Sequence, residues 1–532
     1  MNMKIKESWD SVHHSDVLNC LSSLSGDEVF TSPNLVNRIL DTFPEEIWMD
    51  DSVKFLDPSS KSGVFLREIT KRLQIGLKNK IPDESDRLSH ILRNQVFGIA
   101  TTDLTARISR RTVYCSQYAD GEKSIHTFDD NQGNIKFKDV PHFFSDGKRC
   151  KYCGANKQFY DKKNSQEDYA YTFIHIDNIM EIFDMKFDVI IGNPPYQLRV
   201  GNKTGNKAKA IAIYHKFIEQ AIRLNPKYIS MITPSRWMSR SAAGVPDEFV
   251  DKMLNDKRIR SCHDFLSSKE CFPSLKSPIK GGVNYFLWDK TYQGECEYYI
   301  YKNRDNFETR KQFLDNLNTG VVIRNFTASD IIKKIVDIEG RYFENTAENF
   351  SGLVSAKDFF TNKEKLTSSW DKYSENESKE KHIKCYLNKL IHKKDFAWIS
   401  DEDIAKNHSS IALNKVYIAA ASGSGDDDQV LSQPFLGEKN SACSQTYLVV
   451  GYHPTLHNFS EEQCKNIISY IETRFFRYLV NIKKNTQNGP RGVYEFVPLQ
   501  DFTKTYTDEM LYKKYKLTKN QIKEIEKIRP LN

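Results

Sequence analysis

The strongest indication of the fold is the run Phe187-Asp188-Val189-Ile190-Ile191-Gly192-Asn193-Pro194-Pro195-Tyr196. Its first part is a stretch of branched apolar residues that ends in glycine, which is typical of a central strand in a parallel sheet. Ligands of open α/β sheets bind beyond the carboxyl ends of such strands. The sequence therefore predicts a Rossmann-like α/β domain with Asn193 at its ligand-binding edge.

The residues after this strand suit the binding of an exocyclic amine. The Asn193 side-chain oxygen and the Pro194 carbonyl offer two acceptors for N–H groups, and the Pro-Pro backbone fixes the second one. Tyr196 offers a ring on which an extruded base can stack, because an enzyme that acts on a base must take it out of the duplex. We therefore interpret Asn193, Pro194, Pro195 and Tyr196 as catalytic. A proline-rich turn with an incidental aromatic residue is the alternative.

A second motif lies upstream, in the run Phe55-Leu56-Asp57-Pro58-Ser59-Ser60-Lys61-Ser62-Gly63-Val64-Phe65-Leu66. It has the form of a strand, a turn of small residues and a helix start, in which backbone N–H groups meet a ligand at the helix N-terminus. Together the two motifs resemble the γ-class amino methyltransferases of restriction–modification systems, whose cofactor motif reads Asp-Pro-x-x-Gly-x-Gly-x-Phe. Val29-Phe30-Thr31-Ser32-Pro33 resembles the Phe-Thr-Pro segment that precedes this motif.

The resemblance covers roughly the first 290 residues and implies S-adenosylmethionine as cofactor. The run Phe173-Ile174-His175-Ile176-Asp177-Asn178 falls at the family's third cofactor motif, so Asp177 is the expected acceptor for the adenine amine of the cofactor. The cofactor-binding residues that the resemblance implies are Thr31, Pro33, Asp57, Pro58, Ser59, Gly63, Phe65, Asp177 and Asn193.

Two positions depart from the family pattern. Lys61 stands in place of the first turn glycine, which the family uses for a close backbone approach to the cofactor. Ala100 stands where the second strand should end in a ribose-binding acid, and the nearest carboxylate, Asp103, follows three residues later. These departures keep open the alternative of a DNA-binding specificity subunit with a weak or lapsed cofactor site.

A cysteine pair indicates a metal site. Cys150-Lys151-Tyr152-Cys153-Gly154 has the form of a zinc knuckle, in which two thiolates grip one ion and the glycine permits a tight turn. We expect Cys115 and His142 to complete a structural Zn²⁺ site, with His126 as the competing imidazole. The polar segment at about 115–167 is then an insertion with the knuckle as its core. Two reduced thiols without a metal are the alternative reading.

Length and composition set the outer limits. The chain has 532 residues and a net charge of +7, which permits nucleic-acid binding without indicating it. Because there is no run of eighteen apolar residues and no apolar leader, we expect a cytoplasmic protein outside the membrane. We predict a methyltransferase domain at 1–325 and a mixed α+β target-recognition domain at 326–532.

Cationic side chains indicate where DNA binds. A loop after the catalytic tetrapeptide carries four cations beside Tyr196. A second group lies in the C-terminal domain, where the family resemblance places sequence recognition. The predicted DNA contacts are Arg199, Lys203, Lys207, Lys209, Lys483, Lys484 and Arg491, and solvated surface is the alternative for both groups.

The sequence thus predicts a site-specific adenine methyltransferase that acts on a flipped adenine in double-stranded DNA. A leading Asn rather than Ser in the tetrapeptide resembles the adenine-modifying version of the family. Methylation of RNA or of protein glutamine is the alternative activity. A restriction nuclease is expected on a separate chain, because the methyltransferase motifs begin within the first thirty or so residues. A helicase is expected there too, because the phosphate-loop pattern G-x-x-x-x-G-K-[ST] is absent from the C-terminal half.

Overall fold

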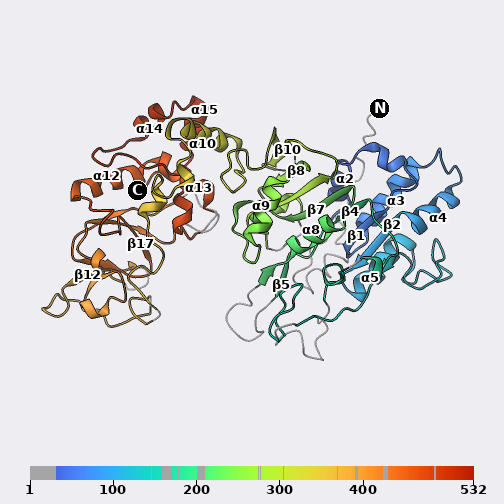
Figure 1. Ribbon diagram of the computed structural model, residues 1–532, viewed down its shortest axis with the longest axis horizontal. Coiled ribbons are helices and arrows are strands. Elements are labelled where there is room, and N and C mark those ends of the chain that lie inside the picture. Colours follow the sequence, from blue (N-terminus) through green and yellow to red (C-terminus); the bar gives the residue numbers. More distant parts are fainter. Residues whose placement is uncertain are drawn as a thin grey trace. The chain divides into compact units, whose positions relative to one another are not determined.

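The computed structural model describes residues 31–531 except 145–146, 158–169, 178, 200–209, 274, 276, 304, 363, 368, 390–392, 423–428 and 485–486. The chain divides into two compact units (Figure 1). Unit 1 runs to residue 316 and includes 320–322, whereas unit 2 comprises 317–319 and 323 onward.

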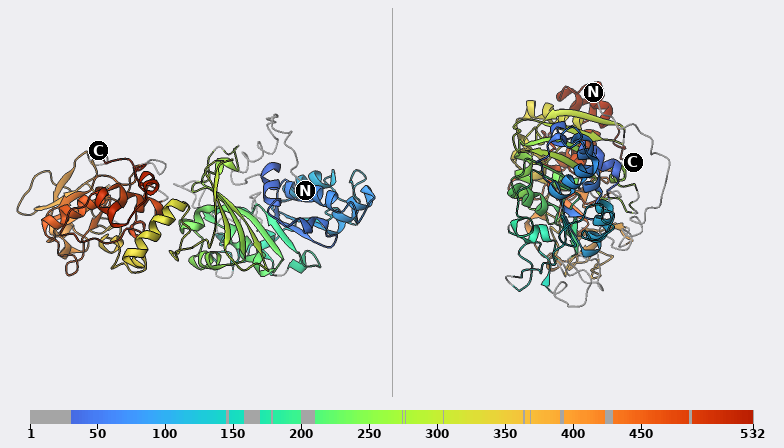
Figure 2. Two further views of the ribbon diagram at one scale, coloured as in Figure 1. Left: turned by 90° about the horizontal axis from the view of Figure 1, so that it is seen from above. Right: turned by 90° about the vertical axis from the view of Figure 1, so that its right-hand side faces the viewer.

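A nine-stranded twisted sheet forms the centre of unit 1 (Figure 2). Its strand order is β11-β10-β8-β9-β7-β4-β1-β2-β3, and the run from β7 to β3 is parallel throughout. Antiparallel β9 lies between β7 and β8, and β11 pairs antiparallel with β10 at the edge. The strands are β1 (Phe55–Ser60), β2 (Val96–Ala100), β3 (Ile135–Lys136), β4 (Val189–Gly192), β7 (Tyr228–Pro234), β8 (Ile259–Phe265), β9 (Val283–Asp289), β10 (Cys296–Tyr301) and β11 (Phe307–Gln312).

Every residue of β1, β2, β4, β7 and β9 is buried, which fits central strands of a sheet covered on both faces. The predicted open α/β sheet with the 187–192 run as a central strand is confirmed. The covering helices are α2 (Pro33–Leu40), α3 (Val64–Gly76), α4 (Glu84–Asn94), α5 (Asp103–Tyr114), α8 (Tyr214–Arg223) and α9 (Asp247–Asn255).

The strand order places a topological switch point between β1 and β4. From β1 the chain builds β2 and β3 on one side, and it then returns to place β4 on the other side of β1. The loops that follow β1 and β4 therefore leave the same edge of the sheet in opposite directions and open a crevice there. The two sequence motifs meet at this crevice.

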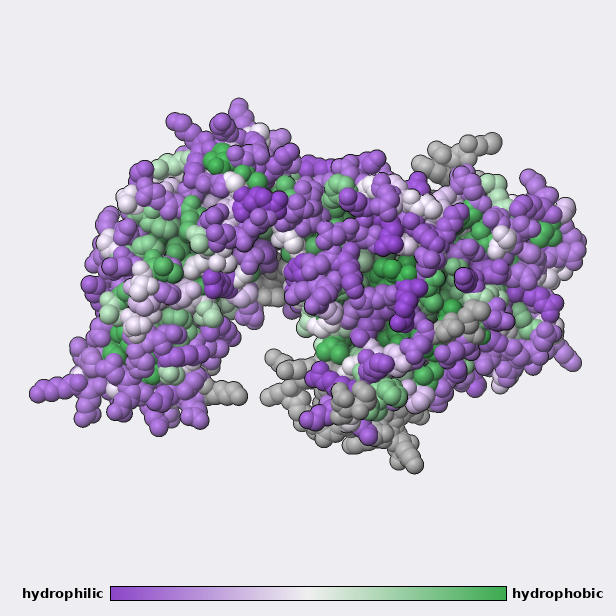
Figure 3. All heavy atoms as spheres, viewed as in Figure 1, coloured by the Kyte–Doolittle hydropathy of each residue, from purple (hydrophilic) through white to green (hydrophobic). Residues whose placement is uncertain are grey.

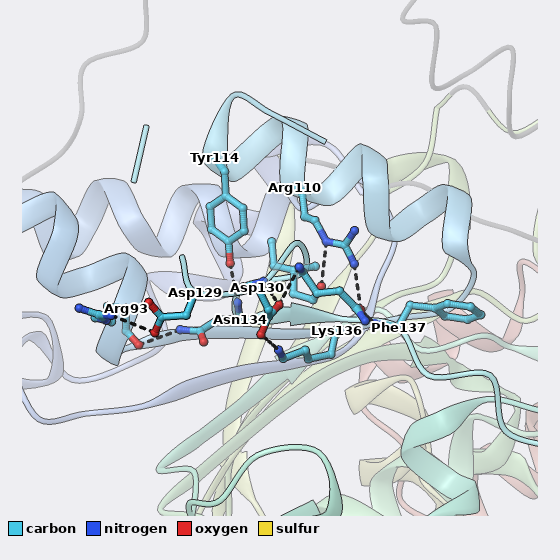
Figure 4. A network of polar contacts seen from close by, with 11 residues as sticks. Arg93, Arg110, Tyr114, Asp129, Asp130, Asn134, Lys136 and Phe137 are labelled. Carbon is cyan, nitrogen blue, oxygen red and sulfur yellow. Dashed lines mark hydrogen bonds and ion pairs between the residues drawn. The ribbon is translucent and has the colours of Figure 1, made fainter. Parts of the chain in front are cut away.

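The first part of the predicted insertion is built onto the sheet rather than around a core of its own. Figure 4 shows Arg110 and Tyr114 of α5 pointing at the loop that leads into β3. Arg110 Nε donates to the Ile135 carbonyl at 3.0 Å, and its Nη2 donates to Gln132 Oε1 at 3.0 Å. The Asn134 N–H donates to the Tyr114 hydroxyl at 3.1 Å. These contacts fix β3 as the edge strand beside β2.

The segment that follows the predicted insertion contains the short helix α7 (Thr172–His175), and β5 (Gln197–Arg199) pairs with β6 (Ala210–Ala212) just after the tetrapeptide. Short 3₁₀ helices complete unit 1: η1 (Glu45–Met49), η2 (Ile179–Glu181), η3 (Ser235–Ser239) and η4 (Ser268–Glu270).

Unit 2 is a mixed α+β structure with two three-stranded sheets, β13-β12-β16 and β15-β14-β17. Ser460 and Gln463 form the capping box that opens α12. The helix ends at Glu472, because the extended Thr473 ends α12 and caps α13. The elements are α10 (Phe326–Glu339), η5 (Tyr342–Glu344), η6 (Phe350–Leu353), β12 (Ile383–Tyr386), β13 (Phe396–Ile399), η7 (Asp401–Asp403), η8 (His408–Ser410), β14 (Lys415–Ala419), β15 (Phe435–Gly437), β16 (Ser441–Cys443), β17 (Tyr447–Val450), α12 (Glu461–Glu472), α13 (Arg474–Lys483), η9 (Arg491–Tyr494), α14 (Asp508–Lys514) and α15 (Lys519–Ile525).

The face of the molecule in Figure 3 is largely hydrophilic, with apolar residues gathered in smaller patches. Among the described residues, no helix combines the length and the apolar character that crossing a membrane requires.

Candidate cofactor and catalytic site

A cavity opens at the switch point between β1 and β4. It encloses about 250 Å³ of space, part of which is open to solvent. The cavity brings together the upstream motif and the tetrapeptide, which lie more than 120 residues apart in the sequence. Its lining residues are Thr31, Asp57, Ser59, Lys61, Ser62, Gly63, Val64, Phe65 and Asn193.

Asn193 is oriented by the Phe-Thr-Pro-like segment. Its side-chain nitrogen donates to the Thr31 hydroxyl at 3.1 Å, and both side chains are buried. Ser32 caps α2 by accepting from the Leu35 N–H, and Pro33 is the first residue of that helix. Because Thr31 accepts from the amide nitrogen, the acceptor that Asn193 can offer to a ligand is its amide oxygen.

The end of β1 is shaped by Pro58, which has no N–H for the ladder. The pairing of β1 with β2 shifts register between Asp57 and Ser60, as expected where a proline interrupts a central strand. The turn leaves Ser59 3% exposed, and its hydroxyl has no hydrogen-bond partner among the described residues. A buried hydroxyl without a partner at the cavity wall fits a polar ligand there.

Gly192 and Gly63 allow the backbone to approach closely at the site. A Cβ on Gly192 would lie 2.6 Å from Asp57 Oδ1, so no larger residue fits between the ends of β4 and β1. Gly63, with φ of +74°, caps α3, and a Cβ there would lie 2.9 Å from the Ser109 backbone. The first helical turn after Gly63 contains Phe65, and its N-terminus faces the cavity.

Asp57 is the most perturbed acid of the cavity. Burial raises its pKa to about 7, although the Ser59 N–H, at 3.1 Å from Oδ1, and the positive charge of Lys61 oppose this shift. Lys61 is itself only 7% exposed and lines the cavity, and its carbonyl accepts from the Ser109 hydroxyl at 3.2 Å. The residue that replaces the family glycine thus brings a cation to the cofactor cavity.

The rest of the tetrapeptide is also buried. Tyr196 is 7% exposed, and its hydroxyl has no partner among the described residues. Stacking of a base on this ring therefore requires the ring to be uncovered. Tyr285 in β9, another aromatic residue of the sheet, stacks on His263 at 4.6 Å between ring centroids.

Two carboxylates near the expected cofactor motifs have different partners: Asp103, which follows β2, and Asp177, in the third cofactor motif. Asp103 begins α5, where its exposed carboxylate forms an ion pair with Arg107 at 2.9 Å. Asp177 is exposed, two residues after α7, and Oδ2 accepts from the Tyr152 hydroxyl at 3.2 Å. Val29, Phe30 and Asn178 lie outside the described residues.

Four potential metal ligands come together, three from the second part of the insertion and one from α7. The ligand atoms of His142, Cys150, Cys153 and His175 all lie within 4.8 Å of one another. Cys150 Sγ is 3.4 Å from His175 Nε2, and Cys153 Sγ is 3.3 Å from His142 Nδ1. Three of the side chains are buried and His142 is partly so.

The structure corrects the predicted ligand set. Cys115 is exposed and ends α5 in the left-handed conformation, and it is not part of the cluster. His126 packs its ring on Phe128 instead of joining the cluster. His175 takes the fourth place, and sequence reasoning missed it because it stands in a run that resembles a cofactor motif.

The surroundings of the cluster prepare its atoms for a cation. His175 Nδ1 lies 2.8 Å from the Tyr171 carbonyl, so the proton of the neutral ring sits on Nδ1 and the Nε2 lone pair faces Cys150. Hydrogen bonding from Cys153 and the two imidazoles lowers the pKa of the Cys150 thiol. Gly154 turns the knuckle with φ of +78°.

The predicted DNA contacts of unit 2 have partners within that unit. Lys483 pairs with Glu495, Lys484 Nζ donates to two backbone carbonyls at 2.6 and 2.9 Å, and Arg491 Nε donates to the Ser351 carbonyl at 2.8 Å. These contacts give the three side chains structural roles, and their contact with DNA stays a prediction. Lys203, Lys207, Lys209 and the side chain of Arg199 lie outside the described residues.

Comparison with known proteins gives matches in sequence and in structure. Residues 94–272 match the family described as Eco57I restriction-modification methylase. An uncharacterized adenine-specific methylase of Mycoplasma pneumoniae is 37% identical over 371 residues, which are 64% of this chain and 86% of the relative.

Solved structures of longer enzymes also match. A nuclease-deletion mutant of the Type ISP restriction-modification enzyme LlaGI with a DNA substrate mimic has a TM-score of 0.47 at 12% identity, over 90% of this chain and 47% of that one. The DrdV–DNA complex has a TM-score of 0.45 at 12% identity, over 89% and 56%. The chain thus spans about half the length of these two structures.

The family match covers residues 94–272, and the 37% identical relative is matched over 86% of its length. The cavity where both motifs meet agrees with these matches. The chain belongs to the adenine-specific methylases of restriction–modification systems of the Eco57I type, a family whose cofactor is S-adenosylmethionine.

Proposed function

We propose that the protein transfers a methyl group from S-adenosylmethionine to the N6 amine of an adenine flipped out of double-stranded DNA. The observation that carries the proposal is the placement of Asn193. Its amide is oriented by Thr31 and opens onto the same cavity as the β1–α3 turn, so an amine held there lies beside any cofactor bound by the turn.

The residues present fit such a cofactor. The unpartnered Ser59 hydroxyl, the N-terminus of α3 and the glycines at 63 and 192 give a polar wall with close backbone approach. When bound, S-adenosylmethionine supplies a methyl group on a sulfonium, which is open to in-line attack by nitrogen. Asp57 offers the cavity a carboxylate that can face the positive charges of the methionine moiety.

Asn193 and Pro194 perform the chemistry by positioning. The Asn193 oxygen and the Pro194 carbonyl accept the two N–H bonds of the adenine amine, which directs the nitrogen lone pair toward the methyl donor. As the N–C bond forms, the methyl–sulfur bond breaks with its electron pair left on sulfur, so positive charge passes to the nitrogen, where the same two oxygens stabilise it. One N6 proton then leaves to solvent.

Methylation assays with Asn193→Ala test the proposal. We expect N6-methyladenine in DNA treated with the unaltered protein and a fall in rate of about 10²–10³-fold or more for the variant, because one of two preorganised acceptors is lost. Asn255→Ala, at an exposed helix end, is the control and should leave the rate unchanged. Full activity of Asn193→Ala, or a product that is only 4-methylcytosine, contradicts the proposal.

A DNA-binding specificity subunit is the second candidate, and Ala100 with the outward-facing Asp103 favours it. Calorimetry separates the two functions, since only the methyltransferase requires S-adenosylmethionine to bind. The same assay mixture with RNA or a glutamine-bearing protein tests the other substrates. In this proposal unit 2 recognises the target sequence, and any nuclease or helicase is a separate chain.

We also propose that the cluster of His142, Cys150, Cys153 and His175 holds a structural Zn²⁺ ion. Tetrahedral zinc with thiolate and imidazole ligands has ligand–ligand edges of about 3.3–3.8 Å, and the cluster already has sulfur–nitrogen distances of 3.3 and 3.4 Å. Elemental analysis should give one zinc per chain, less in Cys150→Ser, and an unchanged amount in Cys115→Ser. Zinc-free unaltered protein overturns this part of the proposal.

A further inference from the structure

We infer that the metal-binding loop contributes to the cofactor site by fixing Asp177, the residue that the family resemblance implies as the acceptor for the adenine amine of the cofactor. The inference rests on the proposed function. It assigns Tyr152 and His175 as positioning residues, one lying between the two cysteines of the cluster and the other belonging to it.

The first connection between the cluster and Asp177 runs through the backbone. His175 ends α7, with Nε2 at the cluster and Nδ1 at the Tyr171 carbonyl, and Asp177 follows two residues later. Between them, the Ile176 carbonyl accepts from Gln220 Nε2 at 3.2 Å. The backbone before Asp177 is therefore tied to the cluster on one side and to α8 on the other.

The second connection runs through a side chain. The Tyr152 hydroxyl donates to Asp177 Oδ2 at 3.2 Å, while the Tyr152 ring packs on the His175 ring at 5.4 Å between centroids. An ionised carboxylate offers about four acceptor sites on two oxygens. The phenol occupies one of them and sets the rotation of the carboxylate, so the other oxygen can accept an adenine amine.

These two connections need the metal because the local structure is weak without it. α7 has four residues, fewer than an isolated helix needs to be stable. The cluster draws on residues from 142 to 175, so one ion would close the loop that carries Tyr152 onto the segment that carries Asp177. Loss of the ion should therefore loosen both.

Tyr152→Phe is the decisive variant because it keeps all four metal ligands. We expect its zinc content to match the unaltered protein, while its Kd for S-adenosylmethionine rises about tenfold, the effect of losing one hydrogen bond to a charged group. Tyr118→Phe, an exposed tyrosine of the same insertion, is the control. His175→Ala should lose both zinc and cofactor affinity, whereas His126→Ala should lose neither.

Two further measurements separate positioning from general loosening. The cofactor analogue that carries a carbonyl in place of the adenine amine should bind the unaltered protein and Tyr152→Phe equally. In the Asp177→Asn background, Tyr152→Phe should have little additional effect on the Kd for S-adenosylmethionine.

The outcomes distinguish the inference from the function on which it rests. If the unaltered protein binds S-adenosylmethionine and Tyr152→Phe or the zinc-free protein binds it equally well, the inference is wrong and the proposed function stands. If the unaltered protein binds no S-adenosylmethionine even with DNA present, both are overturned.

Discussion

Among single residues, Asp57 gives the cavity a charge that changes near neutral pH and can therefore be measured. Its pKa of about 7 leaves it partly protonated near neutral pH, mainly because of burial. A cofactor that brings an ammonium and a sulfonium favours the ionised carboxylate, so binding should release a proton. We expect the affinity for S-adenosylmethionine to rise between about pH 6 and pH 8. Calorimetry in buffers of different ionisation enthalpy should show the release, and Asp57→Asn should abolish it.

The same shift predicts how stability depends on pH. The folded state binds the Asp57 proton more tightly than the unfolded state does, so the stabilisation is complete below the ordinary carboxyl pKa of 3.8 and is lost as pH rises through about 7. Chemical denaturation should give a free energy of unfolding that falls across this window. Because the charge of Lys61 lowers the pKa of Asp57, Lys61→Met should move the upper end of the window to higher pH. A window unchanged in Asp57→Asn would contradict the assignment.

Individual site residues were predictable from the sequence where they belong to a short motif with a known chemical role. Asn193, Thr31 and Gly63 line one cavity. The cysteine pair at 150 and 153 belongs to the cluster of four potential metal ligands. The fourth ligand was wrong because spacing along the chain does not show where a distant segment returns. Cys115 caps a helix elsewhere, and His175 arrives from a segment that begins beyond residue 167.

At the scale of the element, the β1–α3 turn depends on Gly63. An alanine there must keep φ of +74° and also place its Cβ 2.9 Å from the Ser109 backbone. Gly147 has a similar φ of +71° with no atom within 4 Å of the added Cβ, so Gly147→Ala is the matched control within unit 1. We expect a loss of stability of about 1–2 kcal/mol for Gly147→Ala and about 2–4 kcal/mol for Gly63→Ala.

Urea denaturation measures both losses, and equal losses would show that the Ser109 backbone yields to the added methyl group. Gly63→Ala should also weaken S-adenosylmethionine binding, because the first turn of α3 must move and carries the Phe65 wall of the cavity with it. Gly147→Ala should leave the cofactor affinity unchanged.

Elements with strong local signals were predictable, and those set by tertiary contacts were not. The buried strand at 189–192 falls within the run that predicts it, and Ser-x-x-Gln at Ser460 and Thr-x-x-Gln at Thr518, each typical of a capping box, form such boxes. The apolar pattern after Ser460 continues past Thr473, but the helix breaks there, because the Thr473 hydroxyl accepts from the Phe476 N–H and starts a new helix. Asp508 adds acceptors for the Arg474 and Phe475 N–H groups from a segment more than thirty residues away.

At the scale of the whole molecule, the two units have separate sheets and separate hydrophobic cores. The cavity and the metal-type cluster lie entirely within unit 1. Cofactor binding should therefore require unit 1 alone. Under the proposed function, unit 2 selects the DNA sequence. Residues 320–322 belong to unit 1, where the Val322 N–H donates to the Met238 carbonyl at 2.8 Å. A shortened chain that keeps unit 1 intact must therefore end after residue 322.

A chain shortened to end at Arg324 tests this division of labour. Its Kd for S-adenosylmethionine should equal that of the full chain, because every lining residue of the cavity remains. Its methylation of DNA should become slow and should lose site preference, since contacts to base edges specify sequence while contacts to phosphates only position the protein. Calorimetry and sequencing of modified bases measure the two effects. A shortened chain that keeps the site preference of the full chain would place sequence recognition in unit 1, and a loss of cofactor binding with folding intact would show that unit 2 helps to form the cavity.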